Sequence, residues 1–166
     1  MAVFKGDRFI ADDWRTLAPE EEPPLDGKVI IGLRYWLTAR AELPADRAIG
    51  LLIEPGQDIQ AIGADLPRFA LIAVAFPKFT DGRGYSYARQ IRDHGFHGEL
   101  RAVGDILFDQ LQFLARCGFD SFEITDAATT RLLLTGRRPH LDMFYQPGLP
   151  SEVKEPTRPW ARRTQP

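Results

Sequence analysis

Short apolar segments alternate with segments of helical periodicity from residue 28 onward, and no other feature of the sequence restricts the fold as much. The apolar segments span residues 29–33, 49–53, 69–76, 100–103 and 122–125. Helical or turn segments follow them at residues 34–43, 59–66, 81–94, 106–117 and 127–135. Such alternation is typical of parallel strands joined by right-handed crossovers. We therefore predict an α/β fold with a mostly parallel sheet of about five strands. An open sheet is the preferred form, and a partial βα-barrel is the alternative.

Two of the predicted helices end in the same dipeptide, glycine followed by phenylalanine, at residues 95–96 and 118–119. Glycine adopts the left-handed conformation that ends a helix without a Cβ clash, and the next apolar residue packs back on the last turn. A strand segment follows each pair, so the repeat is about the length of one βα unit. We expect both pairs to be helix ends.

The helix predicted over residues 81–94 has one face of small and apolar side chains, which suits close packing on a sheet: Gly84, Ala88, Ile91 and Gly95. Its arginines, Arg83, Arg89 and Arg92, are then expected to point to solvent. Aromatic and arginine side chains are favoured at the centres of protein interfaces. We therefore take four residues of this helix as candidates for contact with a protein partner: Tyr85, Tyr87, Arg89 and Arg92.

The length of 166 residues suits one domain with a sizeable core. We assign residues 1–146 to a single α/β domain. Within it, residues 1–18 form a β-hairpin turning at Gly6 and Asp7, residues 19–27 a proline-rich acidic linker, and residues 28–146 the βα core. Residues 147–166 are rich in proline and are predicted to be an extended or disordered tail.

The overall charge is nearly balanced, with a formal net charge of −2. This balance offers no general attraction for nucleic acid or an anionic membrane. The longest apolar run, residues 69–76, is far too short to cross a bilayer, and the first residues lack a long apolar signal region. We expect a cytoplasmic protein.

The chain has one cysteine, Cys117, which excludes an intrachain disulfide, a Cys-x-x-Cys pair and a four-cysteine cluster within the chain. Its place in the last turn of a helix predicts a packed, unreactive thiol. The histidines, His94, His97 and His140, are too few for a typical zinc site of about four ligands. We predict neither a metal site nor a bound cofactor.

Carboxylates recur where strands pass into helices, at Asp81, Asp105 and Asp126, and Glu54 ends the second strand. Aspartate is a preferred helix N-cap and complements the helix dipole, so three separate caps are the first interpretation. The alternative is that the carboxylates face one crevice, where they would bind magnesium or share protons.

The loop from Lys78 to Tyr87 supplies glycines, two cations and hydroxyls ahead of a helix. Free N–H groups at a helix start attract anions, but the glycine spacing matches neither a dinucleotide fingerprint nor a phosphate-binding P-loop. A small oxyanion such as sulfite or sulfate, or the acidic surface of a partner, fits these residues better than a nucleotide. An ordinary turn with solvated cations is the other interpretation. The ligand-binding candidates are Lys78, Asp81, Arg83, Tyr85, Arg101 and Asp105.

Arg101 stands out among these candidates because it lies inside a strand that helices should cover on both faces. A buried guanidinium must be paired. We expect a structural salt bridge first and a ligand contact second.

Residues 81–120 carry a resemblance to a known family, in the runs Asp81-Gly-Arg-Gly-Tyr-Ser, Gly95-Phe, Gly98-Glu-Leu-Arg-Ala-Val-Gly-Asp105, Asp109-Gln-Leu and Arg116-Cys-Gly-Phe-Asp120. The chain resembles an uncharacterised bacterial family described as oxidoreductases involved in sulfite reduction. Its members are typically encoded beside the enzymes of assimilatory sulfate reduction.

The resemblance implies an accessory protein or subunit in that reduction, but it assigns no catalytic residue. Two hypotheses follow. The protein binds a small oxyanion at the 78–87 loop as an enzyme or enzyme subunit, or it docks without catalysis on sulfite reductase, its electron donor or another enzyme of sulfate assimilation.

Overall fold

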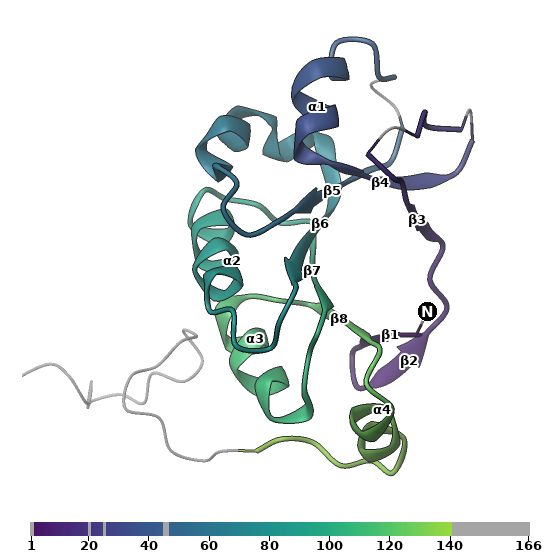
Figure 1. Cartoon of the computed structure of the whole chain (residues 1–166), viewed down its shortest axis with the longest axis vertical. Helices are drawn as coiled ribbons and strands as arrows, with labels where there is room; N and C mark the ends of the chain where they lie inside the picture. Colours follow the sequence, from purple (N-terminus) through teal and green to yellow (C-terminus); the bar gives the residue numbers. More distant parts are fainter. Residues whose placement is uncertain (1, 20, 25, 45–46, 141–166) are drawn as a thin grey trace, which may run out of the picture.

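The computed structural model describes residues 2–19, 21–24, 26–44 and 47–140, so the predicted tail at 147–166 lies outside the described residues (Figure 1). Within the described ranges the strands form one eight-stranded sheet in the order β2-β1-β8-β7-β6-β5-β4-β3. The strands are β1 (Ala2–Lys5), β2 (Arg8–Ile10), β3 (Trp14–Thr16), β4 (Lys28–Gly32), β5 (Ile49–Ile53), β6 (Phe69–Phe76), β7 (Glu99–Gly104) and β8 (Ser121–Ile124). Strands β3 to β8 are parallel, whereas β1 is antiparallel to both β2 and β8.

A helical element follows each strand from β4 to β8, as the alternation predicted. The α-helices are α1 (Leu33–Ala39), α2 (Arg83–Asp93), α3 (Leu111–Cys117) and α4 (Ala127–Leu134), and the 3₁₀ segments are η1 (Ile59–Arg68) and η2 (Phe108–Gln110). Figure 1 shows helices α1, α2 and α3 along one face of the sheet. The mixed α/β class with a mostly parallel sheet is confirmed.

The number of strands differs from the prediction, because the sheet has eight strands rather than five. The five predicted strands are β4 to β8. The N-terminal hairpin forms with its turn at Gly6 and Asp7, both at positive φ, but it also continues the sheet, since β1 pairs with β8. Strand β3 extends the opposite edge beside β4. These strand pairings join parts of the sequence that are not neighbours, so the alternation of apolar and helical segments could not predict them.

The sheet is curled into a half-barrel, and the connection between its two edge strands shows why. Strands β2 and β3 lie at opposite edges, yet three residues, 11–13, connect them. Eight strands in a flat sheet would place these edges about 34 Å apart, whereas four residue steps span at most about 14 Å. The edges must therefore approach each other, with the connection on the side of the sheet away from α2 and α3 (Figure 1).

The two faces of the sheet are filled differently. Alternate residues of each strand point to opposite faces, and the large apolar core lies under the helices, around Ile31, Leu51, Val74 and Leu100. The concave face holds a small apolar cluster of Ile30, Leu71 and Ala73, with Trp14 packed against it. The concave interior is thus occupied by the protein's own side chains.

The two glycine–phenylalanine pairs end helices as predicted. Gly95 and Gly118 have φ of 85° and 109°, and the N–H groups of Phe96 and Phe119 donate to carbonyls five residues earlier. The close approach of α2 is also confirmed, because a Cβ at Gly84 would lie 2.4 Å from the Phe76 ring. None of the described helices is long and apolar enough to cross a membrane.

Candidate functional site

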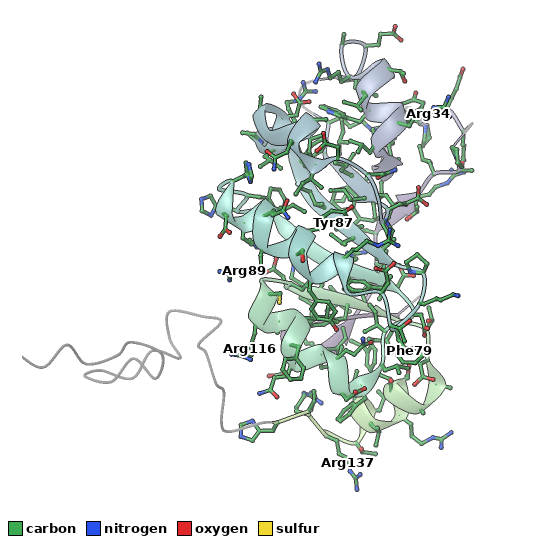
Figure 2. All side chains as sticks on the ribbon, turned by 60° about the vertical axis from the view of Figure 1, so that its left-hand side comes forward. Arg34, Phe79, Tyr87, Arg89, Arg116 and Arg137 are labelled. Atoms are coloured by element: carbon green, nitrogen blue, oxygen red, sulfur yellow. The ribbon has the colours of Figure 1, made fainter. Side chains whose placement is uncertain are left out.

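The loop after β6 projects an aromatic ring at the carboxyl ends of the strands, where ligands of α/β proteins usually bind. The Phe79 ring remains 48% exposed, although side chains hold both backbone polar groups of this residue. Its N–H donates to the Asp105 carboxylate (3.0 Å), and its carbonyl accepts from the Gln110 amide (2.7 Å). Figure 2 shows Phe79 at one side of the molecule, away from Arg89 and Arg116. The backbone is therefore fixed while the ring faces outward.

Asp105 anchors this loop, and its predicted role as a helix cap was wrong. Its N–H donates to the Phe76 carbonyl (2.8 Å) and its carboxylate accepts from Phe79. The next helical segment begins three residues later, where Gln110 accepts from the N–H of Leu107. Gly104 permits this close contact, because at its φ of 106° a Cβ would lie 2.4 Å from the Phe76 oxygen.

Asp81 and Arg83 neutralise each other at the start of α2. The Arg83 guanidinium donates to both carboxylate oxygens (2.9 and 2.6 Å), and the Arg83 N–H donates to the same carboxylate. These hydrogen bonds hold the pKa of Asp81 below its usual value. Arg83 also lies beside the loop after β5, since a Cβ at Gly56 would be 3.8 Å from its Nη1. The anion-attracting start of the helix is thus already occupied by the chain's own carboxylate.

Lys78 differs from Arg83, because its ammonium has no hydrogen bond or ion pair to any residue within the described ranges. It belongs to a run of four exposed residues, 77–80, that includes Phe79. Lys78 is therefore the cation of the predicted anion loop that is available to a ligand or partner.

The tyrosines of α2 face inward. The Tyr87 hydroxyl accepts from the N–H of Gly56 (2.9 Å) and donates to the Gln57 carbonyl (3.0 Å), which ties α2 to the loop after β5. The Tyr85 ring packs edge-on against Phe76 at 5.6 Å, and burial raises the pKa of its hydroxyl. Both rings therefore serve packing within the protein.

Arg92 does not point to solvent as predicted. Its guanidinium donates to carbonyls that end neighbouring elements, including Gly118 (2.8 Å) and Phe96 (2.8 Å), and it pairs with Asp120 (2.6 Å). Such a guanidinium joins the ends of α2 and α3. Of the arginines predicted as contact residues, Arg89 is the exposed one.

Arg101 lies on the concave face and is 2% exposed. It donates to Glu99 (2.9 and 3.1 Å) and to Asp12 (2.9 Å) of the connection between the sheet edges. Glu99 also accepts from Ser121 (2.7 Å) and Lys5 (2.5 Å). These five residues, Lys5, Asp12, Glu99, Arg101 and Ser121, are here called the concave network. The expected structural salt bridge is present.

The two glutamates near this network have opposite pKa shifts. Burial raises the pKa of Glu99, but hydrogen bonds from Lys5, Ser121 and Arg101 outweigh that effect, so its pKa lies below the usual value. Burial raises the pKa of Glu123 on β8, and its attraction to Arg101 is weaker. Glu99 is therefore the charged anchor of the network, and Glu123 loses its proton less readily than an exposed glutamate.

Apart from Tyr85, whose ring packs against Phe76, the structure separates the predicted ligand residues into two groups. Arg101 belongs to the concave network, where Glu99 and Ser121 begin their strands, whereas Lys78, Asp81, Arg83 and Asp105 lie at the opposite, carboxyl ends. In βα-barrels, residues at the amino ends of the strands serve stability and those at the carboxyl ends serve function. The strand-end group is therefore the candidate functional site.

Asp126 caps α4, since its carboxylate accepts from the N–H of Thr129 (2.5 Å), as predicted. Burial raises the pKa of the half-buried Cys117 thiol. In the part of the chain that the structure describes, no three His, Cys, Asp or Glu side chains are placed to hold a metal ion.

Sequence reasoning missed Phe79 and Gln110 as parts of the strand-end site, and Asp12 and Glu123 near the concave network. An aromatic residue in an otherwise polar loop was the available signal for Phe79. Nothing in the sequence indicated the others, because their roles depend on contacts with distant residues.

Fold and site together define an α/β half-barrel protein with a filled interior and a rigid, exposed strand-end loop. The chain belongs to the family described as "Bacterial protein of unknown function (DUF934)", whose model matches residues 50–155. Comparisons with curated proteins and with solved structures found no match.

Proposed function

We propose that this protein is a non-catalytic accessory protein of assimilatory sulfite reduction, which docks on sulfite reductase or its electron donor. The resemblance of residues 81–120 supports the pathway. The observation that carries docking is the ring of Phe79, exposed on a backbone that Asp105 and Gln110 hold in place. A rigid exposed aromatic side chain binds a partner without a large cost in conformational entropy.

The charges of the same region favour docking over catalysis. Asp81 is bound by Arg83, and Asp105 by the N–H of Phe79. Arg101 is bound on the concave face by Glu99 and Asp12. Each of these three side chains therefore has a structural partner, and a catalytic role would require that interaction to break.

Binding measurements with purified sulfite reductase and with its electron donor test this proposal. The immobilised full chain is expected to bind one of these two proteins. It should not bind the control, an unrelated bacterial protein of similar net charge. Absence of binding to both at low and at moderate salt would contradict the proposal. The visible spectrum of the freshly purified protein is a second measurement: a flavin or haem band would favour an enzyme instead.

A second candidate function is the binding of a small oxyanion at the 78–87 loop. It is favoured by the ammonium of Lys78, which has no hydrogen bond or ion pair in the described part of the chain. Arg83 lies in the same loop, and an anion there would have to compete with Asp81 for its guanidinium. Calorimetry with sulfite and sulfate would show heat that Lys78→Ala and Arg83→Ala reduce. The control is Arg131→Ala, at an exposed position on α4. No heat with either anion would exclude this function.

A further inference from the structure

We infer that the partner offers an apolar pocket with a carboxylate at its rim, into which Phe79 inserts while Lys78 pairs with the carboxylate. This inference rests on the proposed docking function and names the chemistry of its contact.

The pocket follows from the way the loop is held. Asp105 is itself fixed to β6 by its N–H bond to Phe76 (2.8 Å). Gln110 is fixed by Leu107, whose N–H donates to its amide oxygen (3.0 Å). The backbone of Phe79 therefore has anchors at its N–H and its carbonyl, and each anchor is braced by a second contact. Because the backbone is anchored, the ring cannot move inward to pack on its own protein. A pocket on another molecule is therefore the way to bury it.

The carboxylate follows from the charge balance of the loop. The Arg83 charge is compensated by Asp81 at 2.6 Å. The Asp105 carboxylate accepts from the N–H of Phe79 and keeps its negative charge, because an amide donor does not neutralise it. The ammonium of Lys78, the residue directly before the ring, forms no hydrogen bond or ion pair with any residue in the described part of the chain. Opposite charges across an interface guide association and fix its register. A carboxylate placed beside Lys78 at the rim of the partner's pocket therefore complements this loop.

Substitutions at the two positions, in the full chain, give the first test. The quantity measured is the affinity for sulfite reductase or for its electron donor, whichever of the two the full chain binds. Phe79→Ala is expected to weaken this binding by about 30-fold, the size of a hot-spot truncation. Lys78→Glu should weaken binding by about 10-fold through like-charge repulsion. Lys78→Arg keeps the positive charge, so this variant should bind as the natural protein does. Phe113→Ala is the matched control, since that ring on α3 is 43% exposed. Unchanged binding in Phe79→Ala or Lys78→Glu would overturn the inference.

Site-specific crosslinking in the producing bacterium gives the second test and separates the two proposals. A photoreactive phenylalanine analogue at position 79 is expected to yield one discrete protein adduct, and the same analogue at position 113 none. Adding Lys78→Glu should reduce the yield, and the linked peptide should carry Asp or Glu beside apolar residues. No protein adduct, or a yield that Lys78→Glu leaves unchanged, would overturn the inference.

The proposed role in sulfite reduction and the proposed contact through Phe79 and Lys78 can fail separately. An adduct that meets these criteria with a protein outside sulfite reduction supports the contact and contradicts the pathway. Binding of sulfite reductase that neither substitution weakens supports the pathway and overturns the contact.

Discussion

The two ends of the parallel strands use charged side chains in opposite ways. At the amino ends, the concave network buries Arg101 and satisfies it with Glu99 and Asp12. At the carboxyl ends, Asp105 and Gln110 bind backbone groups of the loop after β6 and leave Phe79 and Lys78 outside. Charge at one end holds the sheet closed, and at the other end it shapes a surface. Substitutions at the first should therefore affect folding, and those at the second should affect binding.

The largest effect on folding is expected from Arg101→Met. Removal of the buried guanidinium leaves Asp12 without its ion pair and Glu99 with Lys5 as its remaining cation. Breaking a buried pair in this way costs about 3–5 kcal/mol. Urea denaturation measures this loss. Arg131→Met, at an exposed position, should change the unfolding free energy by less than about 0.5 kcal/mol. If both variants were equally stable, the concave network would have no role in closing the sheet.

Gly104→Ala tests the close backbone contact with Phe76 that anchors the strand-end loop. A Cβ there meets the Phe76 oxygen at 2.4 Å and must also accept a φ of 106°, so a loss of about 2–4 kcal/mol is expected from strain and clash together. Gly27→Ala isolates the dihedral contribution, because Gly27 has φ +91° and nothing within 4 Å of an added Cβ. Its loss should be about 1 kcal/mol. Equal losses would show that close packing at Gly104 contributes nothing.

The two concave-face glutamates should shift stability in opposite directions with pH. The pKa of Glu99 is lowered on folding, so its contribution is present above the unfolded value of 4.5 and is lost as the pH falls through the folded pKa. The pKa of Glu123 is raised, so its ionisation opposes folding as the pH rises above 4.5.

Denaturation of Glu99→Gln and Glu123→Gln across the acid-to-neutral pH range measures both contributions. At pH 7, Glu99→Gln should be less stable than the natural protein and Glu123→Gln more stable. Both differences should shrink as the pH falls below 4.5. Differences of the same sign would contradict the opposite roles of these carboxyls.

The smallest effect on folding is expected from Phe79→Ala. Its ring is about half exposed, so the unfolding free energy should change by less than about 1 kcal/mol, which thermal and urea denaturation would show. Together with the expected loss of partner binding, this result would separate the two strand ends. A large loss of stability would show that the ring packs within the protein.

What the sequence predicted correctly was encoded over short distances. The helix ends at Gly95 and Gly118 depend on a dihedral angle that glycine adopts at low cost, so a dipeptide sufficed. The five parallel strands followed from alternation alone. By contrast, Asp12 reaches Arg101 across 89 positions, and Gln110 reaches Phe79 across 31. Asp105 has the residue type and position of a helix cap, yet the turn after β6 takes its carboxylate first.

The pairing of β1 with β8 also determines when this molecule can finish folding. Residues 2–5 are made before the rest of the sheet, and their partner strand, residues 121–124, is made more than a hundred residues later. The N-terminal hairpin can pair within itself, but its docking onto the sheet and the completion of the concave network require β8. Until then the central strands β4 to β7 are covered on the helical side alone. The half-barrel is thus completed after β8 has emerged, and a nascent chain halted before residue 121 would expose its concave face to chaperones.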